Sequence, residues 1–196
     1  MNKLLLLSAA IFASINVYGQ GTVNFGNNAA TAVMNSVTGA RIAKGNEFTA
    51  QLWYAPDRGT APDASAMIAL GATTGISPIA GLITGGTRTT PTLANGGTAG
   101  GGNAYFQIRI WETAYGATFA TAVTTTLNGR LAIAGASGIF KVATGDPGAI
   151  PPGTPGALTA AGGLTAFNVD QIIPEPSIIG LGLLGAGSLL FLRRRK

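Results

Sequence analysis

Two segments of the chain alternate between apolar and polar residues with the period of a β-strand. In residues 48–54 and 105–111, the even-numbered positions carry Phe, Ala, Leu, Tyr and Ile, whereas the odd-numbered positions carry mostly Thr, Gln, Arg and aromatic residues. Successive side chains of a strand point to opposite faces, so this pattern indicates two strands with one face on a core. We therefore expect both segments to lie in a sheet, with Phe106, Ile108 and Ile110 buried.

Shorter apolar runs between Gly and Asn clusters predict further strands. A single helix is expected over 114–127, because Tyr115, Phe119, Ala122 and Val123 recur at helical spacing. Residues 145–163 are rich in Pro and Gly and predict a loop. Several short strands with frequent turns favour a mostly β fold, an antiparallel β-sandwich with one short helix. The shorter strands are expected at 22–25, 79–83, 87–93, 139–142 and 164–169.

The first 19 residues have the three parts of a secretory signal peptide. Lys3 provides a positive start, residues 4–15 form an apolar run, and Val17 and Gly19 occupy the positions of a small-residue cleavage site. The mature protein is then expected to begin at Gln20. The alternative is a buried N-terminal helix, but position, order and length all favour export.

The other end of the chain has the pattern of a short membrane anchor. Residues 178–192 contain no charge and are followed by the cations Arg193, Arg194, Arg195 and Lys196. As a helix, this segment would be about 22 Å long, which is short against a hydrocarbon core of about 30 Å. The cations are expected to stop transfer through the inner membrane. A core helix and a nucleic-acid-binding patch are the less favoured alternatives.

Directly before the apolar segment stand Pro174, Glu175 and Pro176. The Pro-Glu-Pro motif, the apolar segment and the basic end together resemble the PEP-CTERM sorting signal of Gram-negative bacteria. The resemblance covers only about residues 171–196, and it implies recognition by exosortase, an integral membrane protease. It also implies export to the cell surface or extracellular space, in many cases with exopolysaccharide or biofilm matrix. The alternative is a simple spacer between body and anchor.

These features divide the chain into a signal peptide (1–19), a body (20–173) and a sorting tail (174–196). The net charge of +5 comes mostly from the two ends, because the body carries seven basic and six acidic residues. A nearly neutral body does not favour nucleic-acid binding. We expect an exported envelope or matrix protein that is tethered in the inner membrane as a precursor and then released to the surface.

Composition narrows the chemistry that the body can perform. The chain has no His and no Cys, which excludes Ser-His-Asp and Cys-His nucleophilic sites, disulfides and the usual zinc ligand sets. Asp57 and Asp63 share a loop but lack the ligand spacing of a calcium site. We therefore expect no enzyme, no catalytic residues, no metal and no cofactor. A hydrolase with two carboxylates drawn from the scattered acids is a weaker alternative.

The odd-numbered face of the two long strands suggests one binding surface. Trp53, Tyr105, Arg109 and Trp111 would together offer aromatic faces beside a guanidinium donor, which suits sugar rings. A carbohydrate-binding module for exopolysaccharide is therefore the alternative function. The competing interpretation is ordinary packing of these aromatic residues under loops or a helix, which is the commoner situation for Trp in strands.

Overall fold

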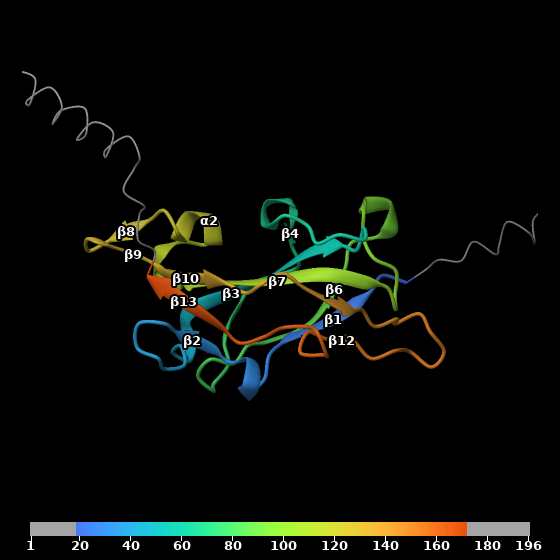
Figure 1. The fold of residues 1–196 in the computed structure, drawn as a ribbon, viewed down its shortest axis with the longest axis horizontal. Coiled ribbons are helices and arrows are strands. Elements are labelled where there is room, and N and C mark those ends of the chain that lie inside the picture. The colour runs from blue at the N-terminus through green and yellow to red at the C-terminus, as the bar shows by residue number, and fades with distance from the viewer. Residues whose placement is uncertain (1–18, 172–196) are drawn as a thin grey trace, which may run out of the picture.

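The computed structural model describes residues 19–171, and this part of the chain is mostly β-structure (Figure 1). The predicted signal peptide up to residue 18 lies outside the described residues. The sorting motif Pro174–Pro176, the apolar segment 178–192 and the basic end 193–196 lie outside them as well. Within residues 19–171, no helix is both long and apolar enough to cross a membrane.

The strands are numbered in chain order. They are β1 (Thr22–Gly26), β2 (Val33–Asn35), β3 (Gly45–Pro56), β4 (Ile68–Ala69), β5 (Thr74–Ile76), β6 (Thr84–Thr89), β7 (Asn103–Glu112), β8 (Thr126–Leu127), β9 (Arg130–Leu131), β10 (Ile133–Ala136), β11 (Phe140–Ala143), β12 (Gly156–Ala157) and β13 (Phe167–Gln171). The helical elements are α2 (Phe119–Ala122) and the 3-10 turns η1 (Ala29–Thr31), η2 (Ala64–Ala66), η3 (Leu93–Asn95) and η4 (Thr113–Tyr115).

The strands form one large sheet, one small sheet and a short hairpin. The large sheet has the order β2-β13-β10-β7-β3-β4, with β11 also pairing with β7 and β5 with β3. The small sheet has the order β12-β1-β6, and β8 pairs with β9. Figure 1 shows the small sheet below the β3–β7 pair, with α2, the β8–β9 hairpin and β4 above it.

The antiparallel pair β3–β7 is the centre of the fold. Its register runs without interruption from Phe48 opposite Glu112 to Pro56 opposite Ala104. The even-numbered apolar residues of both strands are buried, and they share one core with residues of β1 such as Phe25. The predicted alternation and the burial of Ile108 on this face are confirmed, because Ile108 is 0% exposed.

Two bridges connect the small sheet to the large one. Thr22 of β1 exchanges two backbone hydrogen bonds with Gly145, which follows β11. Ile83, next to the start of β6, bridges to Ile76 of β5. Each sheet therefore curls toward the other around the shared core.

The sheets are mixed, which corrects the prediction of a purely antiparallel arrangement. β1 pairs with β12 in parallel, and β13 pairs with β2 in parallel. Each of these pairs joins strands from opposite ends of the described chain. Crossovers of this kind leave no local signal, because turn residues and periodicity report only on neighbours in sequence.

The predicted helix over 114–127 is wrong in length. Gly116 follows η4 with φ 159°, α2 covers only Phe119–Ala122, and β8 begins at Thr126. The run of Thr after Val123 favours extended backbone, because β-branched residues are restricted in a helix. The apolar residues of the predicted helix still pack together, against Trp111.

Two of the shorter strand predictions need correction. Residues 79–83 form a turn, with Gly81 at φ 74°, rather than a strand. The strand expected at 87–93 is β6, which starts earlier and ends at Thr89, two residues before Pro91. Proline cannot donate to a strand ladder, so it marks the end of this strand.

The two ends of the described chain lie at opposite ends of β7. Gly19 accepts a hydrogen bond from the amide of Gly100, just before β7 begins, and Gln20 bridges to Ala99. Gln171 pairs with Ile133, whose neighbour Ala134 lies opposite Trp111 near the end of β7. We call these regions the Gly19 end and the Gln171 end of the body.

Candidate functional site

The odd-numbered face of β3 and β7 is covered rather than open. Trp111 is 0% exposed and donates its indole N–H to the carbonyl oxygen of Gly116 at 2.8 Å, while Phe119 of α2 packs edge-on against its ring. Tyr105 is 8% exposed, with Nζ of Lys141 5.6 Å from its ring centroid. The predicted exposed platform is therefore wrong for Trp111 and Tyr105, whose rings are used in packing.

The other two platform residues, Trp53 and Arg109, form a stacked pair. The guanidinium carbon of Arg109 lies 3.7 Å from the ring centroid of Trp53, which is half-buried. Arg109 donates to Oε1 of Gln107 at 2.9 Å and to the carbonyl oxygen of Ala64 at 2.6 Å. Burial lowers the pKa of Arg109, but a guanidinium remains protonated in proteins. Arg109 thus connects the centre of β7 to the segment that follows β3.

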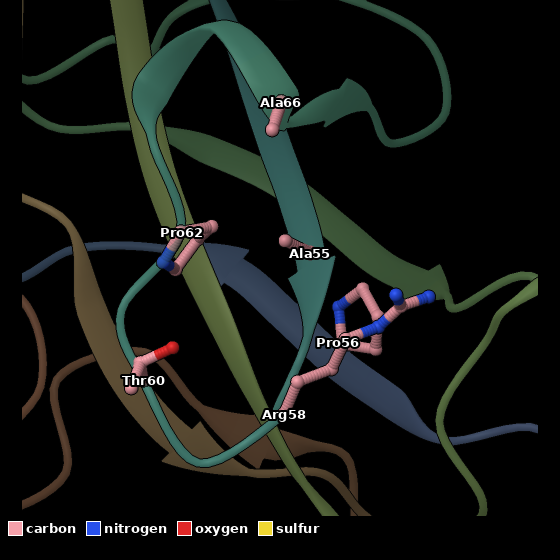
Figure 2. Close-up of a pocket in the computed structure, with 6 residues that line it drawn as sticks. All are labelled: Ala55, Pro56, Arg58, Thr60, Pro62 and Ala66. Carbon is pink, nitrogen blue, oxygen red and sulfur yellow. The ribbon is translucent and has the colours of Figure 1, made fainter.

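That segment, residues 57–66, frames a hollow of about 290 Å³ on the same face. Figure 2 shows the chain passing Arg58, turning, and returning through Thr60 and Pro62 to Ala66, with Thr60 and Pro62 directed toward Ala55. We call this space the 57–66 hollow. Its lining residues are Ala55, Pro56, Arg58, Thr60, Pro62 and Ala66.

Both ends of the framing segment are held in place. At its start, Oδ1 of Asp57 accepts a hydrogen bond from the amide of Gly59 at 2.9 Å, and Oδ2 lies 3.3 Å from Nζ of Lys141. The hydrogen bond from Gly59 lowers the pKa of Asp57, and Lys141 lowers it further. At its end, Arg109 holds the carbonyl of Ala64. The hollow is therefore bounded by a segment anchored to both β11 and β7.

One charged side chain, Arg58, lines the 57–66 hollow. Asp57, its neighbour, is already paired with Lys141, and no ion pair joins Arg58 to any residue of the described chain. The other lining residues present proline rings, alanine methyl groups and the hydroxyl of Thr60. Sequence reasoning missed this site, because it considered the loop only as a calcium ligand set; its closely spaced prolines and single arginine were the available signal.

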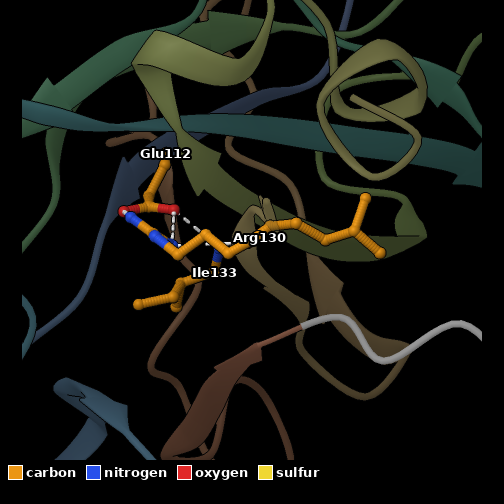
Figure 3. A network of polar contacts seen from close by, with 4 residues as sticks. Glu112, Arg130 and Ile133 are labelled. Atoms are coloured by element: carbon orange, nitrogen blue, oxygen red, sulfur yellow. Dashed lines mark hydrogen bonds and ion pairs between the residues drawn. The ribbon is translucent and has the colours of Figure 1, made fainter. Parts of the chain in front are cut away.

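A second polar network lies at the Gln171 end of the body. Figure 3 shows Glu112 accepting two hydrogen bonds from Arg130, at 2.8 and 2.6 Å, and one from the amide of Ile133 at 2.7 Å. The Arg130 guanidinium also lies 5.0 Å from the ring centroid of Tyr115. These contacts join β7, the β8–β9 hairpin and β10, so this network stabilises the fold.

Residues 19–171 hold no group of three or more His, Cys, Asp or Glu side chains that could bind a metal ion. Two of the acids, Asp57 and Glu112, are engaged with cations. No protein-family model, no curated protein and no solved structure matches this chain.

Proposed function

We propose that the chain is an exported, non-enzymatic protein of the cell envelope or extracellular matrix that exosortase sorts or processes through its C-terminal tail. The observation that carries this proposal is the order of the tail: Pro174-Glu175-Pro176, then the apolar segment 178–192, then four cations. The signal-like start of the chain supports it, since export must precede sorting at the membrane.

The position of the motif relative to the body supports the same function. The last strand, β13, ends at Gln171, and Pro174 follows three residues later. Proline cannot extend a helix and restricts the residue before it to extended backbone. Two prolines around Glu175 therefore favour an extended peptide just outside the body, which is the form of substrate that a protease binds.

A temporary anchor explains the composition of the apolar segment better than a permanent one. A stable span needs about 20 apolar residues, whereas 178–192 has fifteen, four of them Gly. Small residues also allow close packing against another membrane helix, as recognition by a membrane protease would require.

For the body we propose a β-sandwich, with the small and large sheets as its two layers. The support is the shared core, in which Val23 and Phe25 of β1 pack in one cluster with Leu52 and Phe106 of the central pair. Without cysteine, this core and the hydrogen-bonded sheets must hold the exported body together.

The sorting proposal is tested by Glu175→Ala in a host that carries exosortase. This change keeps both prolines and the whole apolar segment, so tail-bearing precursor should accumulate in the inner membrane and surface protein should fall. Asp170→Ala, which removes an exposed acid of β13, is the matched control and should sort normally. An unchanged ratio of membrane to released protein in the Glu175→Ala variant would leave a plain single-span anchor.

The intact mass of the released protein tests both ends at once. We expect it to begin at or near Gln20 and to lack the tail. Released protein that still starts at Met1 would refute the signal peptide, and released protein that retains Lys196 would refute tail removal.

The alternative function, carbohydrate binding, no longer has its predicted surface. Trp111 and Tyr105 are buried, and Arg109 covers the ring of Trp53. Any carbohydrate site must therefore use a different surface.

A further inference from the structure

Gln20 becomes the first residue of the chain when the signal peptide is removed after Gly19, and its surroundings are part of the described structure. It forms an antiparallel bridge with Ala99. The hydrogen bonds of this bridge come from its neighbours: the amide of Gly21 donates to the carbonyl oxygen of Thr98 at 2.9 Å, and the carbonyl of Gly19 accepts the bond described above. Gln20 therefore occupies a non-hydrogen-bonded position of the pair, where its own backbone groups point away from its partner.

The two reactive groups of Gln20 are its backbone nitrogen and its side-chain amide. Within residues 19–171, neither group forms a hydrogen bond with another residue. Gln20 is half-buried, and the residue directly across the bridge, Ala99, presents only a methyl group on the same face. The described body therefore holds the backbone on both sides of Gln20 without engaging the groups of Gln20 itself.

An N-terminal glutamine can react with itself. Cleavage after Gly19 turns the backbone nitrogen of Gln20 into an α-amine, and this nitrogen can form a bond to Cδ of its own side chain. The bond from Cδ to Nε2 breaks, and ammonia leaves. The α-ammonium and the side-chain amide thus give a lactam and one ammonium ion, so atoms and charge balance without an oxidant or a second reactant. Because both groups belong to one residue, no other molecule has to be positioned.

The fold permits this ring closure without losing any hydrogen bond of the described body. The ring consists of the nitrogen, Cα, Cβ, Cγ and Cδ of Gln20. The bond from Gly21 to Thr98 and the two bonds between Thr22 and Gly145 lie outside it and stay in place. The position of the cut decides the chemistry, because the residues before and after Gln20 are glycines, which have no side chain to cyclise.

A carboxylate near the new terminus offers the free amine a different partner. Oδ1 of Asp146 lies 3.6 Å from the position that a Cβ on Gly19 would take, and it accepts a hydrogen bond from the amide of Gly148 at 2.9 Å. Asp146 forms no ion pair with a cation of the described chain. An α-ammonium at Gln20 can pair with it, but such a partly exposed pair contributes only about 0–1 kcal/mol. This pairing slows ring closure without preventing it.

We propose that Gln20 is a modification site: after cleavage it closes to pyroglutamate, and the mature protein begins with an uncharged lactam. This inference rests on the proposed export and on cleavage after Gly19. Its consequence is protection of β1, the middle strand of the small sheet, which carries Val23 and Phe25 into the core. Aminopeptidases start at a free α-amine, so the lactam keeps them from trimming the chain toward this strand outside the cell.

The test is mass spectrometry of the N-terminal peptide of the released protein. Trypsin cleaves after Arg41, the first basic residue beyond Gln20, so this peptide covers residues 20–41. We expect its mass to be lower than that of the encoded peptide by one ammonia. An isotope-labelled synthetic peptide of the same sequence with a free N-terminal glutamine, added before digestion, reports any ring closure caused by handling. The lactam fraction of the protein should exceed that of the labelled peptide and rise with the age of the culture.

Two variants and one enzyme make the assignment specific. Gln20→Asn keeps a terminal amide but would need a strained four-membered ring, so its peptide should retain a free amine and should be degraded by an aminopeptidase. Gln171→Asn, the matched control, changes an exposed glutamine of β13 and should leave the lactam fraction unchanged. Pyroglutamyl aminopeptidase should remove exactly one residue from the wild-type peptide and none from the Gln20→Asn peptide.

The remaining outcomes would overturn the inference, and they separate it from the proposed export. A released protein whose 20–41 peptide has no more lactam than the labelled peptide would refute the modification and leave the cleavage site standing. A released protein that begins at another residue would refute both. An equal loss of ammonia in the Gln20→Asn variant would assign the reaction to another residue of the peptide.

Discussion

Ile108 offers the sharpest test of the fold, because its side chain lies at the middle of the central strand. It is 0% exposed, pairs with Leu52 across the β3–β7 ladder and belongs to the core shared by both sheets. Its backbone amide donates to Oγ of Ser137 at 2.9 Å, a contact that side-chain substitution leaves intact. Substitution at this position therefore changes packing and little else.

The expected loss in the free energy of unfolding grows along a series of substitutions at Ile108. Ile108→Val removes one methylene and should cost about 0.5–1.5 kcal/mol, and Ile108→Ala about 2–5 kcal/mol, including the cavity left behind. For a domain of this size, each kcal/mol lowers the melting temperature by about 2–4 °C, so the Ala variant should melt about 4–20 °C lower. Ile108→Asp also buries a carboxylate whose pKa must rise by about 3–5 units, a further cost of about 4–7 kcal/mol. The packing loss and the cost of burying the carboxylate together approach the free energy of unfolding of an ordinary domain, about 5–15 kcal/mol.

The measurement is urea and thermal unfolding of the purified variants, followed by circular dichroism. Ile150→Ala is the matched control, since Ile150 is 100% exposed and its truncation should change the free energy of unfolding by less than about 0.5 kcal/mol. An unchanged midpoint in Ile108→Ala or Ile108→Asp would show that the strand, or the face it buries, has been assigned wrongly.

Three further predictions concern single contacts. Gly135→Ala should destabilise the protein clearly, because the added Cβ would lie 2.6 Å from the carbonyl oxygen of Asn168. Gly138→Ala is the control and should not destabilise it, because the space around Gly138 is open. Melting curves of the two variants, measured in parallel, test this difference. Glu112→Ala should lower the free energy of unfolding by about 1–2 kcal/mol and Glu112→Gln by less, because Gln can still accept from the Ile133 amide; urea unfolding that ranks them equally would contradict this. The pKa of Asp57 is lowered in the folded protein, so its ionised carboxylate stabilises the folded state. This stabilisation is complete above the ordinary carboxyl pKa, about 3.9, and is lost as the pH falls through the lower pKa of the folded state. Protection of the Gly59 amide against hydrogen exchange, relative to the intrinsic exchange rate at each pH, should therefore fall on acidification, and the Asp57→Asn variant should not show this acid step.

The central pair was predictable because its signal is local. Every second residue of 48–54 and 105–111 is apolar, and burial of that face follows directly from the period of a strand. The burial of the opposite face was not predictable. The elements that cover it are η4, α2 and the segment 57–66, which are short and carry weak patterns of their own.

The candidate site was predicted only in part, for a similar reason. The sequence singled out Trp53 and Arg109, but it could not show that Arg109 reaches the carbonyl of Ala64, 45 residues away in the chain. The hollow itself is lined mainly by Ala, Pro and Thr, which are common in loops of any function. Its identity as a site depends on two anchors, Lys141 and Arg109, that come from other strands.

The pairing of Gly19 has a consequence for the export that we propose. The carbonyl of Gly19 accepts a hydrogen bond from Gly100 at 2.8 Å, and the next residue, Gln20, forms a bridge with Ala99. A peptidase that cuts after Gly19 must bind this same stretch as an extended strand, so it competes with the body for one set of backbone groups. Cleavage would then be fastest while the chain is still emerging from the translocation channel, and a body that folds too early would protect its own leader. If the chain is exported as proposed, cleavage and folding would compete in rate for the backbone groups of Gly19 and Gln20, and the residues around Ala99 would compete with the peptidase.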